Sequence, residues 1–191
     1  MAAIVLAAGA STRFGSAKQL VRVAGRPLLH SALAQAGEVA GTAVTVVLGA
    51  RAAELAPLLR HSSASVLINR DWQEGMASSI RLAVSRLPVG CSGVLLMVVD
   101  QAAVTADDLK RLVSAWRRQP GYIAAARYGT TTGVPAIFPR SMFADLQGLR
   151  GDIGARMLLQ RNPDRVIRVP MPSAALDIDT PEDLLALEPK A

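Results

Sequence analysis

The chain has 191 residues, of which 51% are hydrophobic, and a formal net charge of +6. This length suits one domain with a sizeable core, and charged residues interrupt every apolar stretch before the roughly 18 positions that a membrane span needs. Cys91 is the only cysteine, which excludes an internal disulfide and a cysteine-built zinc site.

Aromatic residues make up only 4% of the chain, and the basic residues form no stripe, which argues against a nucleic-acid surface. We therefore interpret the positive charge as compatible with anionic small substrates. Because the first residues lack the basic region of a secretory signal, we expect a cytoplasmic protein.

The first predicted strand begins at Ile4 and runs directly into a loop of small residues. Small side chains let backbone N–H groups approach a triphosphate closely. Ala7, Ala8 and Gly9 would provide this approach, and Leu6, directly before them, is a further candidate nucleotide-binding residue.

Two basic side chains follow in the same loop. Arg13 can hold phosphate oxygens in a bidentate fork, and Lys18 can act as a movable point charge. The spacing fits neither a Walker A loop nor G-x-G-x-x-G, so neither P-loop hydrolysis nor dinucleotide binding is indicated. The alternative is a glycine turn whose charges are merely solvated.

Strands and helices then alternate along the chain. We predict a helix from Pro27 to about Gly37, a strand over 44–48, a helix over 51–60 and a strand over 66–68. This alternation predicts an α/β fold with a mostly parallel sheet and helices on both faces, in which ligands bind at the carboxyl ends of strands.

A second loop, residues 69–79, follows the strand over 66–68. It places polar and small residues where a helix begins, an arrangement that can bind an anion or a base edge. The candidate nucleotide-binding residues here are Asn69, Gly75, Ser78 and Ser79. The alternative is that Ser78 or Ser79 caps the helix, with Trp72 as a partly buried lid residue.

The most apolar predicted strand, residues 93–99, ends in Asp100. A carboxylate beside a phosphate loop is costly unless it meets water, a cation or a donor, and Mg²⁺ bridging Asp100 to the phosphates would meet this need. The alternative is that Asp100 caps the following turn. Further on, Thr105 and Asp108 predict a capping box that opens a helix ending near Arg117.

Three segments in the second half of the chain contain further candidates. A strand over 122–126 precedes a loop with Gly133 and Pro135, which are candidate binding residues. The alternative is a plain hairpin loop in which glycines permit a tight turn. Asp152, after Gly151, is a plausible helix N-cap. Thr180, Pro181 and Asp183 predict a helix start.

That cap leaves Asp177 and Asp179 unexplained. The two-residue period of an extended segment puts both on one face, and like charges this close favour a nearby cation. The residues alone do not decide which of them would bind the cation.

These motifs together resemble those of the MobA-like nucleotidyltransferases, in particular the molybdenum cofactor cytidylyltransferases (MocA type). The first loop fits L-A-A-G-x-S-x-R-x-G-x-x-K, and the second fits N-x-x-W-x-x-G-M-x-x-S. G-V-P, G-D-x-G-A-R and D-I-D-T-P-E-D follow in the family's order. The family has D-x-P where this chain has Asp100-Gln101-Ala102. The absence of the proline bears on the rigidity of the turn after Asp100, not on the metal site itself.

The resemblance implies a Rossmann-like three-layer sandwich of the nucleotide-diphospho-sugar transferase type. It implies one nucleotidyltransferase domain over residues 1–191, with a nucleotide-binding half to about residue 100 and an acceptor-binding half beyond. The roles that it implies are catalysis by Arg13, Lys18 and Asp100, acceptor binding by Gly133, Pro135, Gly151 and Asp152, and Mg²⁺ binding by Asp100 with Asp179 or Asp177.

The implied reaction transfers CMP from CTP to Mo-molybdopterin and yields molybdopterin cytosine dinucleotide and pyrophosphate. CTP is favoured over GTP because guanine-selecting relatives read L-A-G-G where this chain has Ala8. The receiving partner would be a molybdenum hydroxylase or its maturation chaperone. The alternatives are another base, a sugar-phosphate acceptor, or a non-catalytic carrier of the finished cofactor.

Overall fold

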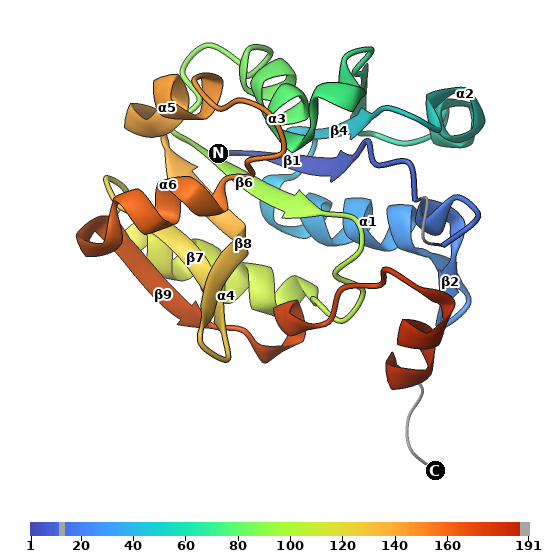
Figure 1. Cartoon of the computed structure of the whole chain (residues 1–191). Helices are drawn as coiled ribbons and strands as arrows, with labels where there is room; N and C mark the ends of the chain where they lie inside the picture. Colours follow the sequence, from blue (N-terminus) through green and yellow to red (C-terminus); the bar gives the residue numbers. More distant parts are fainter. Residues whose placement is uncertain (12–13, 188–191) are drawn as a thin grey trace.

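The computed structural model describes residues 1–11 and 14–187. A seven-stranded sheet in the order β5-β4-β1-β6-β8-β7-β9 forms the centre of the molecule (Figure 1). Its strands are β1 (Ala2–Ala7), β4 (Val44–Leu48), β5 (Ser65–Ile68), β6 (Gly93–Val98), β7 (Ile123–Tyr128), β8 (Thr131–Pro139) and β9 (Val166–Pro170). Within this sheet β8 alone runs antiparallel to its neighbours, which confirms the mostly parallel sheet.

Helices cover both faces of this sheet. The α-helices are α1 (Leu28–Ala40), α2 (Ala52–Leu55), α3 (Met76–Val84), α4 (Ala106–Arg118), α5 (Phe143–Gln147) and α6 (Arg156–Arg161). The 3-10 helices are η1 (Lys18–Leu20), η2 (Ala56–Leu59), η3 (Trp72–Glu74), η4 (Arg140–Met142), η5 (Pro163–Arg165), η6 (Pro172–Ala175) and η7 (Pro181–Leu187), and a small hairpin joins β2 (Arg22–Val23) to β3 (Arg26–Pro27).

The two faces of the sheet have separate apolar cores. Alternate residues of β1 point to opposite faces, so Val5 belongs to the core beneath α1 and α4, whereas Ile4 belongs to the core beneath α3, α5 and α6. Both residues are fully buried. This arrangement confirms the three-layer sandwich, and it explains why the strands read as nearly continuous apolar runs.

Three predicted helix features differ from the structure. The predicted helix over 51–60 is a short α2 that continues as the 3-10 helix η2, with Pro57 in its first turn. The helix predicted to begin after Asp152 begins only at Arg156, so the N-cap role of Asp152 is wrong. The segment after Thr180 forms the 3-10 helix η7, and Asp183 Oδ2 accepts from the backbone N–H groups of Asp179 and Thr180.

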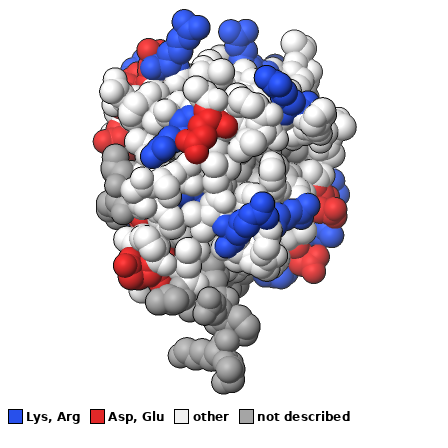
Figure 2. Space-filling model, turned by 90° about the vertical axis from the view of Figure 1, so that its right-hand side faces the viewer, with Lys and Arg blue, Asp and Glu red and all other residues white. Residues whose placement is uncertain are grey.

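On the face shown in Figure 2, Lys and Arg side chains form separate groups among neutral residues, with Asp and Glu beside several of them. Within residues 1–11 and 14–187, no helix is both long and apolar enough to cross a bilayer.

The capping box of α4 is present as predicted. Thr105 Oγ1 accepts from the Asp108 backbone N–H at 3.2 Å, and Asp108 Oδ2 accepts from the Thr105 backbone N–H at 2.9 Å. Ser173 Oγ, from η6, also donates to Asp108 Oδ2 at 2.7 Å. The carboxylate therefore connects the start of α4 to the segment that leads toward Asp177.

We expect Asp108→Asn to destabilise the fold by about 1–2 kcal/mol near neutral pH, because the amide accepts these hydrogen bonds less strongly. Burial raises the pKa of Asp108, but hydrogen bonds from Ser173, Thr105 and Arg111 outweigh it and lower the pKa below 3.8. The stabilisation is therefore present above the unfolded pKa and lost as pH falls through the lower folded value. Urea unfolding at several pH values would measure this, with exposed Asp107→Asn as control; a difference that stays constant below pH 4 would contradict the assignment.

Candidate active site

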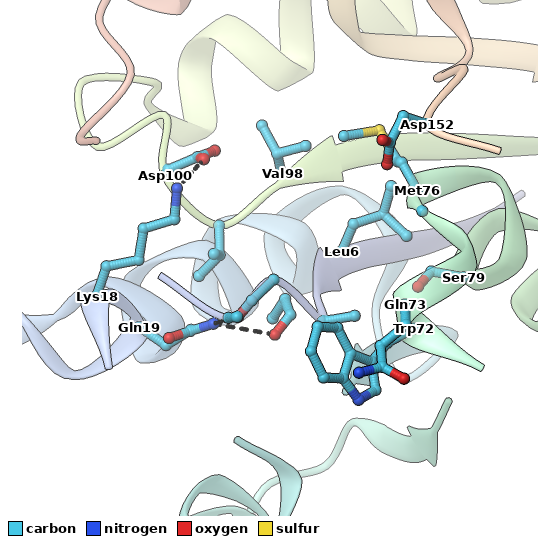
Figure 3. Close-up of a pocket in the computed structure, with 16 residues that line it drawn as sticks. Leu6, Lys18, Gln19, Trp72, Gln73, Met76, Ser79, Val98, Asp100 and Asp152 are labelled. Carbon is cyan, nitrogen blue, oxygen red and sulfur yellow. Dashed lines mark hydrogen bonds and ion pairs between the residues drawn. The ribbon is translucent and has the colours of Figure 1, made fainter. Parts of the chain in front are cut away.

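A cavity of about 390 Å³ opens at the carboxyl ends of β1 and β6 (Figure 3). Parallel pairing of these strands, with Leu6 opposite Val98, brings the loops after them to the same edge of the sheet. The residues that line the cavity are Leu6, Ala7, Ala8, Gly9, Ala10, Lys18, Gln19, Trp72, Gln73, Gly75, Met76, Ser79, Val98, Val99, Asp100 and Asp152. Its size is in the range of small-ligand sites.

The first loop is held from within by Gln19, a residue that the sequence did not single out. Gln19 is completely buried, and its Nε2 donates to the carbonyl oxygens of Ala7 and Gly9, at 3.1 Å each. Its Oε1 accepts from Ser11 Oγ at 3.3 Å. Gln19 therefore fixes the backbone of the predicted phosphate loop, whereas Arg13, the other predicted phosphate ligand, lies outside the described residues.

Lys18 joins this loop to two carboxylates from distant parts of the chain. Its Nζ lies 2.6 Å from Asp100 Oδ2, at the end of β6, and 3.1 Å from Asp179 Oδ1, before η7. Burial lowers the pKa of Lys18, but Asp100 and Asp179 outweigh it and raise the pKa above its ordinary value. The amino group therefore stays positively charged at neutral pH.

Asp177 is close to the same charges. Although its surface remains partly exposed, desolvation and the nearby carboxylates of Asp100 and Asp179 raise its pKa to about 6. The backbone N–H of Ile178, between the two Asp residues, donates to Asp100 O at 3.0 Å. This backbone bond holds the segment 177–179 beside the end of β6, and Asp179 is the residue that shares Lys18 with Asp100.

The second loop is organised by the buried side chain of Asn69. Its Nδ2 donates to Ser78 Oγ at 2.8 Å and to Ser79 Oγ at 2.9 Å. Helix α3 has Gly75 at its N-cap position and no side-chain cap, so the alternative that Ser78 or Ser79 caps it is wrong. Of the predicted residues here, Gly75 and Ser79 line the cavity, whereas Asn69 and Ser78 lie behind it as buried support.

The second loop touches the segment around Asp152 directly. Gly75 has a φ of +108°, and a Cβ on it would lie 2.6 Å from Asp152 N and from Gly151 C. The backbone N–H of Ala77 donates to Gly151 O at 3.1 Å. Asp152 thus reaches the cavity from the second half of the chain, and Gly151 supports it from behind.

Gln101 lies between Asp100 and Ala102, the residue that stands where the resemblance led us to expect a proline. Its buried Nε2 donates to Val134 O at 3.0 Å and to Ala174 O at 2.9 Å. Strand pairing jumps from Ala125–Ala136 to Ala126–Gly133, so Val134 and the cis-linked Pro135 form a bulge. The turn after Asp100 is therefore held by the hydrogen bonds of the Gln101 side chain. One of these bonds reaches the predicted hairpin with Gly133 and Pro135, which does not line the cavity.

At one edge of a mostly parallel sheet, the structure brings together a loop of small residues and a lysine that is ion-paired with two carboxylates. This is the arrangement of a nucleotidyltransferase. Residues 3–166 match the family model of the MobA-like NTP transferase domain. The chain therefore belongs to this family, as its motifs predicted, and the relatives fit its MocA-type members.

The similar proteins span nearly the whole chain. Nicotine blue oxidoreductase of Paenarthrobacter nicotinovorans is 33% identical over 198 residues, which cover 96% of this chain and 94% of that protein. The crystal structure of Rv0371c from Mycobacterium tuberculosis H37Rv has a TM-score of 0.85 at 29% identity, covering 97% of this chain and 95% of that one. A structure of Rv0371c in complex with manganese has a TM-score of 0.80 at 27% identity, covering 97% and 96%.

We expect Gly75→Ala to destabilise the protein by about 1–3 kcal/mol, because a Cβ at positive φ is strained and would collide with the backbone of residues 151–152. Thermal unfolding would measure the loss. Gly37→Ala, inside α1 with open space around its Cβ position, is the matched control and should be neutral or stabilising. Equal effects of the two substitutions would show that the contact between the second loop and residues 151–152 does not stabilise the protein.

Proposed function

We propose that this protein is a CTP:molybdopterin cytidylyltransferase acting in the cytoplasm. The phosphate of Mo-molybdopterin attacks the α-phosphorus of CTP, a new P–O bond forms there, and the bond to the bridging oxygen breaks to release pyrophosphate. The product, molybdopterin cytosine dinucleotide, would pass to a molybdenum hydroxylase or its maturation chaperone.

One observation carries this proposal: the charged amino group of Lys18 lies between Asp100 and Asp179 at the edge of a cavity formed by Ala7, Ala8 and Gly9. Transfer to phosphate needs positioning and charge neutralisation more than a dedicated nucleophile. In our proposal, the backbone of the first loop holds the triphosphate and the Lys18 ammonium stabilises the negative charge that develops on it.

The residues present also fit a divalent metal. Asp100 Oδ1 is buried and has no hydrogen-bond partner among the described residues, which is costly unless a cation or another donor meets it. Among the described residues, no three His, Cys, Asp or Glu side chains form a ready metal cluster. This suits Mg²⁺, which one or two carboxylates commonly hold together with substrate phosphates and water.

In our proposal Asp100 and Asp179 would hold Mg²⁺, with Asp177 beside them. When bound, the metal would neutralise charge on the triphosphate. The manganese complex of Rv0371c supports a divalent cation in a protein of the same fold, at 27% identity to this chain.

For the acceptor, Asp152 is the predicted residue that lines the cavity. We propose that Asp152 contacts the acceptor directly. In our proposal Gly151 supports Asp152 from behind, and Gly133, just before the bulge, and Pro135, within it, act on the acceptor site without lining the cavity. The hydrogen bond from Gln101 to Val134 O supports this role, since it couples the bulge to the Asp100 turn.

We propose that Ala8 sets the base preference. Ala8 lines the cavity, and its Cβ lies so close to Gly49 and Trp72 that a Cβ on Gly49 would be 2.8 Å from it. The first loop is therefore packed against the second at this point. A methyl group fixed by this packing narrows the space for a base, which favours cytosine over guanine.

We expect the purified protein to transfer CMP from labelled CTP to Mo-molybdopterin and to use GTP poorly. Ala8→Gly should shift the GTP-to-CTP ratio of kcat/KM toward GTP by about 10-fold or more, in line with the value of one methyl group in a tight site. Ala10→Gly, in the same loop, is the control. Transfer from GTP alone by the unchanged protein would refute the cytidylyl assignment.

We expect Asp100→Asn to reduce transfer at least about 100-fold, because the amide lowers both the negative charge and the metal affinity of the site. The thermal unfolding temperature should change little, since Asn keeps the shape of the side chain. Asp107→Asn, on the exposed side of α4, serves as the control. Full transfer by Asp100→Asn would refute the proposed role of Asp100, whereas intact cofactor delivery by Asp100→Asn, with no transfer by the unchanged protein, would favour a non-catalytic carrier.

Two alternatives have distinct tests. A sugar phosphate as acceptor would appear in a screen of phosphate-bearing acceptors with CTP. The name of the Paenarthrobacter relative suggests a redox activity as a second candidate function. The first loop of this chain, however, lacks the G-x-G-x-x-G of dinucleotide-binding folds. Oxidation of NADH or NADPH by the same preparation, without nucleotidyl transfer, would support that second candidate.

A further inference from the structure

The amino group of Lys18 occupies the space between the two carboxylates that the proposed function assigns to a metal. Lys18 Nζ bonds Asp100 Oδ2 and Asp179 Oδ1 at once, and its side chain is only 13% exposed. The carboxylate oxygens therefore lie within two hydrogen bonds of each other. A divalent cation that both carboxylates ligate would need nearly the same position.

An ammonium and a divalent cation cannot share this position, since like charges at such a separation repel strongly where solvent is largely excluded. The amino group must therefore move before both carboxylates become available. A lysine can do so without backbone change, because its charge lies at the end of a flexible four-carbon side chain.

We propose that Lys18 closes the metal site in the nucleotide-free protein and opens it when its amino group moves to the phosphates of an incoming nucleoside triphosphate. This inference rests on the proposed function and deepens it by describing how the same site is regulated. Free metal then binds weakly to the empty protein. The triphosphate supplies both the new partner for Lys18 and further oxygen ligands for the metal.

Such an exchange keeps a cation beside the carboxylates in both states. Without ligand, Lys18 neutralises part of the negative charge of Asp100, Asp179 and the nearby Asp177. With ligand, the metal takes over this role and Lys18 serves the phosphates. The carboxylates thus hold a cation in both states, which limits the cost of placing them at the cavity edge.

The first experiment measures Mn²⁺ binding in the absence of nucleotide by the EPR signal of the free ion. We expect Lys18→Ala to bind Mn²⁺ at least about 10-fold more tightly than the unchanged protein. Lys110→Ala is the matched control, because Lys110 Nζ also lies between two carboxylates, 3.5 Å from Glu38 and from Asp107, but on the exposed surface. Unchanged Mn²⁺ affinity in Lys18→Ala would overturn the inference.

A double variant locates the gained ion. Lys18→Ala combined with Asp100→Asn should lose the tighter Mn²⁺ binding, which places it at this pair of carboxylates. If the double variant keeps it, the ion binds elsewhere and the inference is wrong. Near-identical thermal unfolding curves would exclude misfolding as the cause.

The second experiment measures CTP binding in EDTA through tryptophan fluorescence, since Trp72 lines the cavity. Asp179→Asn should tighten metal-free CTP binding several-fold more than Asp177→Asn does, because both remove a nearby charge but Asp179 also holds Lys18. Equal effects of the two variants would contradict the exchange of partners by Lys18.

These outcomes separate the inference from the proposed function. Cytidylyl transfer with an unchanged Mn²⁺ affinity in Lys18→Ala would leave the function standing and overturn the closed metal site. Tighter Mn²⁺ binding in Lys18→Ala, together with no transfer from any triphosphate by the unchanged protein, would support the competition by Lys18 and refute the function.

Discussion

The ion pairs of Lys18 with Asp100 and Asp179 unite three parts of the chain that are far apart in sequence. They join the loop after β1, the end of β6 and the segment before η7 at one edge of the sheet. Each of these charges would be costly alone at a partly buried position, so the ammonium and the two carboxylates compensate one another. The backbone bond from Ile178 to Asp100 holds the pairing in register.

Around this charge centre, two buried amide side chains hold the loops in place. Gln19 bonds the carbonyl groups of the first loop, and Gln101 bonds the bulge near Pro135 and the carbonyl of Ala174. Neither glutamine can be singled out in the sequence. A neutral polar residue beside Lys18 or Asp100 is also what an exposed loop would contain. Their role follows from burial, because a buried amide group must find its hydrogen-bond partners within the protein, here the loop carbonyl groups.

The sequence predicted the central strands over residues 93–99 and 44–48, because such apolar runs favour buried strands, but it did not single out the edge strand β9. It failed at short helix starts. Asp152 looked like an N-cap from local spacing, but its segment packs against Gly75, and this long-range contact decides its conformation. Ser78 and Ser79 likewise accept from Asn69, and neither side chain caps an N–H group of α3.

What the sequence determined by itself was the family, the alternation of strands and helices, and the set of residue types at strand ends, because motif spacing and apolar periodicity are local properties. The tertiary structure alone decided which of these residues meet. It brought Asp179 to Lys18, placed Asn69 and Ser78 behind the cavity, and put Asp152 at its wall. These outcomes depend on contacts between residues up to 161 positions apart, which no local pattern specifies.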